Sequence, residues 1–360
     1  MFNLLPRLPL YVAFRRFGKP RLLPLSLVVS ITYRCNSRCL TCNIWQKRSE
    51  EMSLEEWRKV FAKIGKTPYY LTFSGGEPFL REDIVELVAA AYEECRPAII
   101  TIPTNGLAWR VVPRKVEEIL KVAPGAQVGI NLSLDDIGPR HDAIRGVEGN
   151  YERALRTYED LRRVNHPHLT LGIHTVVSRF NVERLPSIYK ELKTLGADIY
   201  ISEVAEEREE LGTVGSDITP SPEEYAIAAD YLIAEARNFR PSGLAKTTQA
   251  FRSYYYELTK RILKEERQVI PCYAGWASGH IAPNGDLWTC CTRAQPIGNL
   301  RESGYDSAPL WFGEEAARLR RSIAAGECYC PMANASYTNM LLHPPTLFGV
   351  ARALIYALAS

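Results

Sequence analysis

Three cysteines, Cys35, Cys39 and Cys42, fall within eight residues, directly after an apolar run at 25–31 that predicts a buried strand. Thiolates this close together can converge on one inorganic centre. A structural zinc ion takes four protein ligands, and no fourth candidate lies nearby, because the first histidine of the chain is His141. An iron–sulfur cluster held by three thiolates would leave one iron open to another molecule. The alternative is three unrelated buried cysteines.

A second stretch with chemical potential is Ser74-Gly75-Gly76-Glu77-Pro78, which follows the next predicted strand. Two adjacent glycines let a backbone approach a ligand closely, and the Glu77 carboxylate can pair with an ammonium group. Taken alone, the stretch could also be a simple turn before a helix.

The elements that must position these residues follow a repeating pattern of apolar run and amphipathic run. Strands are predicted at 25–31, 69–73, 98–102, 126–134, 169–177 and 198–204, and helices at 53–64, 81–95, 113–122, 151–164 and 182–195. Ser53 with Glu56 predicts a capping box, Asn150 a second helix cap, and Gly196 a helix end. Six such units predict an α/β fold, with a parallel sheet and outer helices curved into a barrel or part of one. Chemistry in such barrels collects where the strands end.

The CxxxCxxC loop followed by the GGE motif resembles the radical S-adenosylmethionine (radical SAM) superfamily. The resemblance implies a partial (β/α)6 TIM-like barrel and a [4Fe-4S] cluster on Cys35, Cys39 and Cys42. It also implies that S-adenosylmethionine (SAM) chelates the open iron and is cleaved by one electron to a 5′-deoxyadenosyl radical. The amino group of SAM is then expected at the GGE motif, formed here by Ser74, Gly75, Gly76, Glu77 and Pro78.

Further site residues are predicted at the ends of the later strands. By the same resemblance, Asn105, Ser133 and Ser178 are expected to contact SAM, and Arg145 to bind its carboxylate, for which a guanidinium fork is suited. Asp135 is expected beside the active cavity and Glu203 inside it, again from the strand ends. The alternatives are a plain turn at Asn105, helix capping by Asp135 and a solvated acid at Glu203.

The C-terminal part carries a second group of cysteines. Asn284-Gly285 predicts a tight hairpin leading to Cys290 and Cys291. Together with Cys272 and a late Cys-Tyr-Cys, this resembles the SPASM and Twitch modules, which bind auxiliary iron–sulfur clusters. The full SPASM form has seven cysteines, so the five here suit Twitch with one auxiliary cluster, expected to be [4Fe-4S], on Cys272, Cys290, Cys328 and Cys330. Cys291 is then a spare thiol; a four-thiolate zinc site and a disulfide are the alternatives.

Composition limits the class of protein. A net charge of +3 over 360 residues does not indicate nucleic-acid binding. Nine cysteines in clusters favour metal binding in a reducing, cytoplasmic setting over a disulfide framework. No acid occurs in residues 1–49, and the tail at 347–359 is apolar but too short to span a bilayer. Both ends could pack on the protein or give it peripheral contact with a membrane surface.

These observations predict a basic amphipathic arm at 1–24, the radical SAM barrel at 25–221, a helical linker at 222–269, the auxiliary-cluster domain at 270–335 and an apolar tail at 336–360. The expected activity is hydrogen abstraction from a substrate C–H bond, as in an oxidoreductase, supported by a reducing partner such as a flavodoxin or ferredoxin. A small-molecule substrate, sugar-like or lipid-linked, is favoured because 24 residues before the first strand are too few for a leader-binding domain. The alternatives are a peptide-modifying maturase, a non-catalytic iron–sulfur electron carrier and a zinc-binding module.

Overall fold

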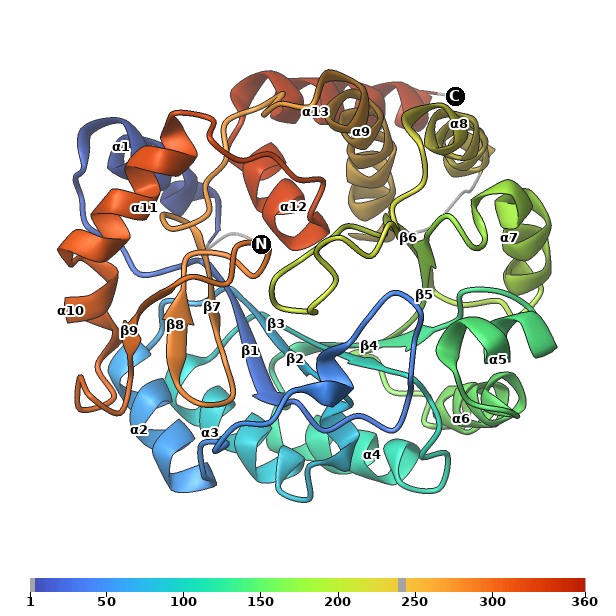
Figure 1. Ribbon diagram of the computed structural model, residues 1–360, viewed down its shortest axis with the longest axis horizontal. Coiled ribbons are helices and arrows are strands. Elements are labelled where there is room, and N and C mark those ends of the chain that lie inside the picture. The colour runs from blue at the N-terminus through green and yellow to red at the C-terminus, as the bar shows by residue number, and fades with distance from the viewer. Residues whose placement is uncertain (1–3, 239–243, 360) are drawn as a thin grey trace.

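The computed structural model describes residues 4–238 and 244–359, and within them a nine-stranded sheet in the order β6-β5-β4-β3-β2-β1-β7-β8-β9 (Figure 1). The strands are β1 (Ser26–Thr32), β2 (Tyr70–Gly75), β3 (Ile99–Thr104), β4 (Gln127–Ser133), β5 (Leu169–Val177), β6 (Ile199–Val204), β7 (Ser278–Ile281), β8 (Asp286–Trp288) and β9 (Pro296–Asn299). The first six pair in parallel and in sequence order, as predicted. Apolar side chains of alternate residues, such as Leu27, Val29 and Ile31, enter the main core, so their neighbours face the inside of the curved sheet.

Helices cover the outer face of the sheet. They are α2 (Leu54–Ile64), α3 (Ile84–Cys95), α4 (Val112–Val122), α5 (Pro139–Arg145), α6 (Asn150–Arg163) and α7 (Leu185–Lys193), which follow one another around the lower and right-hand rim in Figure 1. Cys95 is buried in this layer and its Sγ lies 3.6 Å from the Phe61 carbonyl oxygen. The predicted α/β partial barrel is therefore confirmed.

Two of the predicted helix ends are confirmed and one is wrong. Ser53 and Glu56 form the capping box of α2, and Gly196 takes a left-handed φ of 63° just beyond α7. Asn150 does not cap α6, because it is already the first residue of the helix and its Oδ1 contacts His141. The carboxylate of Asp142 accepts hydrogen bonds from the adjacent backbone instead, from the N–H groups of residues 149 and 151.

The C-terminal strands extend the barrel sheet. β7 pairs in parallel with β1, with Val28 opposite His280, and β8 and β9 add antiparallel strands. The predicted hairpin is present, with Asn284 and Gly285 between β7 and β8. The cysteine-bearing region is thus fixed to the barrel by backbone pairing at β1, the strand that precedes the first cysteine loop.

Further helices close the remaining side. α8 (Pro222–Asn238), α9 (Leu244–Glu265), α12 (Ala333–Leu341) and α13 (Pro344–Ala359) lie together at the top of Figure 1, and α10 (Ser307–Trp311) and α11 (Glu314–Ala324) lie at its left. The loop between β6 and α8, yellow-green in Figure 1, projects toward the centre of the view. The tail helix α13 packs on α9 and α12.

The N-terminal arm forms α1 (Leu8–Phe17), which packs on the C-terminal module. Leu8, Tyr11 and Phe14 are buried in one cluster with Trp276 and Leu342. Among the described residues, no helix combines the length and apolarity needed to cross a membrane. The N-terminal arm therefore packs on the protein itself, which is one of the two arrangements that the sequence allowed for it.

An ion pair joins the module to the barrel helix α2, and we expect it to contribute to stability. Arg301 contacts both Glu56 oxygens, at 2.6 and 3.3 Å, and Tyr305 donates to the same carboxylate at 3.2 Å. Glu56→Ala should cost about 1–3 kcal/mol of unfolding free energy and lower the thermal midpoint by a few degrees. Glu118→Ala, which removes the exposed partner of Arg114 at 4.0 Å, should cost under about 0.5 kcal/mol.

The same pair predicts a pH dependence. The hydrogen bond from Arg301 lowers the pKa of Glu56 to about 2. Its contribution is therefore complete above the unfolded pKa of about 4.3 and is lost as the pH falls toward 2. The difference in thermal midpoint between wild type and Glu56→Ala should shrink over that range; a difference independent of pH would contradict the assignment.

Candidate active site

The cysteine loop is fixed on one side by the diglycine segment at the end of β2. Gly76 N–H donates to the Thr32 carbonyl at 2.7 Å and Glu77 N–H to the Arg34 carbonyl at 2.9 Å. A Cβ on Gly75, whose φ is 116°, would lie 2.1 Å from the Thr32 oxygen, and one on Gly76 would lie 2.2 Å from the Arg34 oxygen. Only glycine fits at either position. These glycines pack closely against the backbone that leads into the cysteine loop. This contact is separate from the ligand contact that was predicted for them.

The other side of the loop is fixed by the C-terminal end of α5. Arg38 N–H donates to the Arg145 carbonyl at 2.9 Å, and Leu40 N–H donates to the Ile144 carbonyl at 2.8 Å. Gly146, with a φ of 65°, ends the helix where a Cβ would lie 2.3 Å from the Arg38 carbonyl oxygen. The loop is thus held between the ends of β2 and α5, so its three cysteines are positioned by two elements distant in sequence.

The three thiols gather on this loop as predicted. Burial raises the pKa of Cys35 to about 11 and that of Cys42 to about 12. The charge of Cys39 contributes to the rise in both pKa values. Protonated, buried thiols of this kind become ligands when a metal centre replaces their protons. Asn105 Nδ2 lies 4.0 Å from Cys35 Sγ, and Arg145 Nη1 lies 3.8 Å from Cys39 Sγ. Donors to the sulfurs are the expected setting of cluster thiolates.

Glu77 is a buried carboxylate, and within the described part of the chain no cationic side chain lies within 4.0 Å of it. It accepts hydrogen bonds from Thr104 Oγ1 at 2.9 Å, Asn105 N–H at 2.8 Å and Phe79 N–H at 3.3 Å. Burial raises the pKa of Glu77 to about 7 in spite of these bonds. An ammonium group brought beside it would stabilise the ionised form, which is what the predicted role requires.

Arg145 has the features of a carboxylate-binding residue. Its Nε lies 2.8 Å from Asp135 Oδ2, while its Nη2 is buried without a hydrogen-bond partner. Asp135 is itself buried, and its Oδ1 accepts the Val176 N–H at 2.8 Å. Asp135 thus orients Arg145 and ties β4 to β5. Among the described residues, Nη2 is thus the terminal nitrogen of Arg145 that remains for the carboxylate of SAM, the role that the resemblance implies.

The other predicted residues occupy two kinds of place. Glu203 lies on β6 with its carboxylate 3.3 Å from His174 Nε2; burial opposes ionisation, but the imidazole lowers the pKa of Glu203 overall. Ser74 is the second-last residue of β2, Ser133 is the last residue of β4, and Pro78 begins a short 3-10 helix. Ser178 is fully buried and contacts Asn181 Oδ1 and Phe180 N–H in a local turn. The catalytic and cofactor roles of these residues stay predictions.

We expect Arg145→Lys to weaken SAM binding by about 10- to 100-fold, because a lysine cannot keep the contact with Asp135 and also hold a second donor toward the SAM carboxylate, a contact worth about 1.5–3 kcal/mol. Calorimetric titration of the iron-loaded protein with SAM measures this. Arg184→Lys is the matched control. Arg184 makes a similar contact with the neighbouring aspartate, Asp136, at 2.8 and 3.1 Å, but it is not one of the predicted SAM-binding residues. Equal affinities of the two variants would show that Arg145 does not bind the carboxylate.

The C-terminal cysteines also converge. Burial raises the pKa of Cys290 to about 12, and the charges of Cys272 and Cys328 add to the rise. Burial also raises the pKa of Cys330, with smaller contributions from Cys272 and Cys290. All four cysteines are partly exposed and unpaired by disulfides.

Cys291 faces a different environment, which sequence reasoning did not find. It is buried with Glu210 and His280, and the three ligand atoms lie within 4.8 Å of one another. Arg208 Nη1 lies 3.9 Å from Cys291 Sγ and 3.7 Å from Glu210 Oε2, a cation already present where a divalent ion would have to bind. Glu210 is one of four glutamates within residues 206–210. A buried acid after β6 could not be recognised from a run of four glutamates.

This buried group connects the barrel to the C-terminal module. His280 Nε2 contacts Ser30 Oγ on β1 at 2.8 Å, and its ring stacks on Trp288 at 4.9 Å. Arg208 Nη1 also lies 3.2 Å from Met332 Sδ. One polar network thus reaches from β1 to the C-terminal module.

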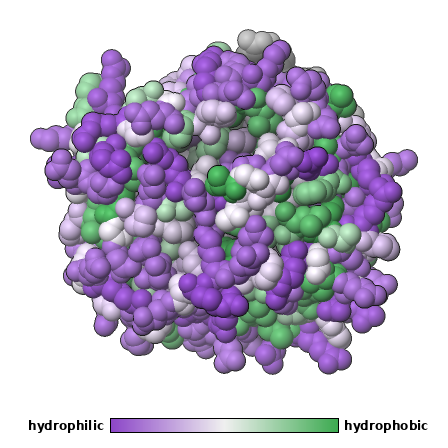
Figure 2. Space-filling model, viewed as in Figure 1, coloured by the Kyte–Doolittle hydropathy of each residue, from purple (hydrophilic) through white to green (hydrophobic). Residues whose placement is uncertain are grey.

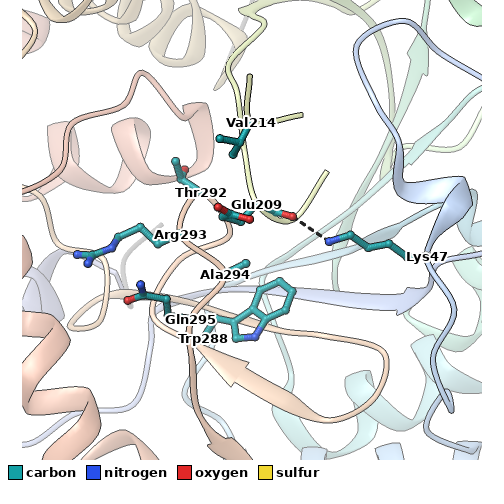
Figure 3. A pocket seen from close by; sticks show the side chains of 8 residues that line it. All are labelled: Lys47, Glu209, Val214, Trp288, Thr292, Arg293, Ala294 and Gln295. Atoms are coloured by element: carbon teal, nitrogen blue, oxygen red, sulfur yellow. Dashed lines mark hydrogen bonds between the residues drawn. The ribbon is translucent and has the colours of Figure 1, made fainter. Parts of the chain in front are cut away.

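A hollow of about 590 Å³ is lined in part by Trp288, whose ring stacks on His280 (Figure 3). It is lined by Lys47, Glu209, Val214, Trp288, Thr292, Arg293, Ala294 and Gln295. Lys47 bridges the cysteine-loop side to the β6–α8 loop by donating to the Glu209 carbonyl at 2.8 Å. The surrounding face is mostly hydrophilic, with smaller hydrophobic areas right of centre (Figure 2).

Comparison with known proteins gives the class. Residues 29–192 match the model of the radical SAM superfamily. Residues 29–192 therefore form a radical SAM domain, a family whose cofactors are a [4Fe-4S] cluster and SAM, and the C-terminal cysteines fit an auxiliary cluster.

Individual relatives extend over different parts of the chain. A PqqA peptide cyclase from Granulibacter bethesdensis is 27% identical over 85% of this chain and 83% of its own length. An Fe-coproporphyrin III synthase from Methanosarcina barkeri is 33% identical, but over only 46% of this chain and 40% of its own length. The solved structure of Streptococcus suis SuiB bound to the precursor peptide SuiA has the same fold, with a TM-score of 0.62 at 18% identity, over 89% of this chain and 72% of that one.

Proposed function

We propose that the protein is a radical SAM maturase that modifies a peptide. The observation that carries this is the match to a peptide cyclase along most of both chains, which includes the C-terminal module as well as the barrel. The match to the porphyrin enzyme covers less than half of either chain. The small-molecule or lipid-linked substrate favoured by the sequence is therefore less well supported than its peptide alternative.

The hollow supports a substrate that enters as an extended chain. It is open to the surface, with charged and amide side chains on its wall, and its floor residue Trp288 stacks on the buried His280. A peptide segment could lie in it, with one side chain reaching down to the network of Arg208, Glu210 and His280. Polar groups that converge on an otherwise closed space are typical of a substrate site.

The residues around the substrate have separable roles. The cluster and SAM, when bound, supply the radical that removes a substrate hydrogen. Arg145 and Glu77 orient the two ends of the cofactor's amino acid portion. The paired Glu203 and His174, 3.3 Å apart on the inner face, offer a proton acceptor for a substrate that is oxidised. The surrounding strands keep water from the reacting atoms.

The auxiliary cysteines suit a net oxidation. After one hydrogen has been removed, the substrate holds an unpaired electron, and loss of that electron and a proton completes a two-electron oxidation. Cys272, Cys290, Cys328 and Cys330 would hold the centre that takes the electron. They lie in the module that the polar network connects to the barrel, which supports this use.

The test is incubation of the anaerobically reconstituted enzyme with SAM, reductant and the short peptides encoded beside its gene. We expect one peptide to lose the mass of two hydrogen atoms, with a crosslink located by fragmentation. A tetrapyrrole or sugar that is consumed instead, with every peptide unchanged, would overturn the proposal.

A further inference from the structure

A second hollow, of about 340 Å³, lies between α1 and α11 and is unusually basic. We call it the arginine groove; it is lined by Phe14, Arg15, Gly18, Arg21, Trp276, Phe312, Ala317, Arg320, Arg321 and Ala324. Four of these ten residues are arginines and none is an acid. Lys19 and Arg16 add two exposed cations beside it.

The arginines of the groove are supported by aromatic rings and carbonyl groups. Arg15 lies over the rings of Tyr273 and Trp276 at 5.3 Å, Arg21 over Phe312 at 5.8 Å, and Arg320 over Phe14 at 5.2 Å. Arg320 also donates to the Trp311 carbonyl at 2.6 Å. Within the described residues, none of the groove's four arginines has an acidic partner within 4.0 Å.

Like charges are therefore held together without compensation. Burial, and then the charge of Arg21, lower the pKa of Arg320 to about 10. Such a concentration of positive charge is unfavourable by itself, and an anionic partner relieves it. Arg21 and Arg321 are exposed, so their guanidinium groups are accessible from solvent.

The groove borders the auxiliary-cluster site. Arg15 Nε donates to the Cys272 carbonyl at 3.0 Å. Cys272 also packs against the cluster of buried residues that contains Phe14 and Trp276. A partner seated in the groove would lie one side chain away from a ligand of the auxiliary centre.

We propose that the arginine groove is the docking site for a small acidic one-electron carrier protein. This rests on the proposed function, in which SAM cleavage consumes one electron and the auxiliary centre receives one. The carrier exchanges single electrons with the auxiliary centre, and no atom is transferred. When the carrier is the donor, it is oxidised by one electron and the centre is reduced by one. When the centre is the donor, it is oxidised by one electron and the carrier is reduced by one. Transient redox encounters use small, charge-complementary contacts of this kind.

The test uses reconstituted holoenzyme and an acidic flavodoxin. Arg21→Glu combined with Arg321→Glu should weaken flavodoxin binding at low salt by about tenfold or more, and should slow cluster reduction by reduced flavodoxin to a similar extent. Reduction by dithionite, which needs no docking, should be unchanged. The matched control is Lys121→Glu with Lys190→Glu, the same charge change on exposed residues of α4 and α7, which should leave flavodoxin binding nearly as in wild type.

Added salt provides a second measurement. At about 0.5 M salt, the wild-type rate with flavodoxin should fall to that of the groove variant, because exposed charges are then screened. Equal loss of binding in the groove and control variants would overturn the proposal. So would a groove variant that binds flavodoxin normally but no longer pellets with anionic lipid vesicles, which would assign the groove to a membrane. If the protein holds no auxiliary cluster, the proposed function fails for a different reason, and the wild-type protein will contain about four irons per chain.

Discussion

Replacing Gly76 with alanine is expected to remove about four of about eight irons per chain and nearly all SAM cleavage. The new Cβ would lie 2.2 Å from the Arg34 carbonyl oxygen, and backbone cannot move aside as a flexible side chain can. The loop that carries the first three cysteines must then shift, and with it the hydrogen bond from Gly76 N–H to the Thr32 carbonyl. Iron analysis and the yield of 5′-deoxyadenosine measure the effect.

Gly138→Ala is the control for this substitution. Gly138 lies on the same side of the barrel, before α5, and a Cβ there meets nothing within 4 Å, so only its φ of 55° is strained. It should cost about 1 kcal/mol of stability and leave the iron content near eight. Full iron content in Gly76→Ala would mean that the diglycine segment does not hold the loop.

Cys290→Ala should abolish the auxiliary cluster, whereas Cys291→Ala should keep it. The two residues are adjacent in sequence, but the charges of Cys272 and Cys328 act on Cys290, while Arg208 and Glu210 act on Cys291. We expect about four irons per chain in Cys290→Ala and about eight in Cys291→Ala, with the first cluster's electron paramagnetic resonance signal present in both. The comparison tests the ligand assignment with substitutions of equal size.

Loss of iron in Cys291→Ala with retention in Cys290→Ala would reverse the assignment. Zinc in place of the second four irons in wild type would instead support the zinc-binding alternative. Both results come from the same metal analysis. The position of Cys291 beside the polar network also leads us to expect that its alanine variant changes substrate turnover more than cofactor binding.

Local patterns were enough to predict the barrel. Alternating apolar runs at β1 to β6 and the capping box at Ser53 follow from burial and helix-end hydrogen bonding, which act over a few residues. The cysteine loop and the diglycine segment could be recognised because their spacing is short. Even so, the sequence did not show that Gly75 and Gly76 contact the loop's own backbone.

Long-range placement could not be predicted in the same way. His280 reaches the inner face because β7 pairs with β1, two segments about 250 residues apart. Glu206 and Glu210 become buried because the β6–α8 loop folds inward, while neighbouring Glu209 lines the hollow. A run of acids gives no sign of which of them will be buried. The extension of the barrel sheet by β7, β8 and β9 also depends on pairing between segments far apart in the sequence, so it could not be predicted from local patterns.

The connection between the barrel and the C-terminal module suits a reaction in which two metal centres act on one substrate. The network of Arg208, Glu210 and His280 connects β1, which precedes the first cysteine loop, to the module that carries the C-terminal cysteines. Pairing of β7 with β1 fixes their separation through backbone hydrogen bonds, so neither site can move independently of the other.

The most direct test of the proposed function is the transfer of deuterium from a labelled precursor peptide to 5′-deoxyadenosine. We predict that a peptide deuterated at its modified residue gives singly deuterated 5′-deoxyadenosine, in step with peptide oxidation. Unlabelled 5′-deoxyadenosine produced at the same rate with and without peptide would contradict the account, because the radical would then not be acting on the peptide.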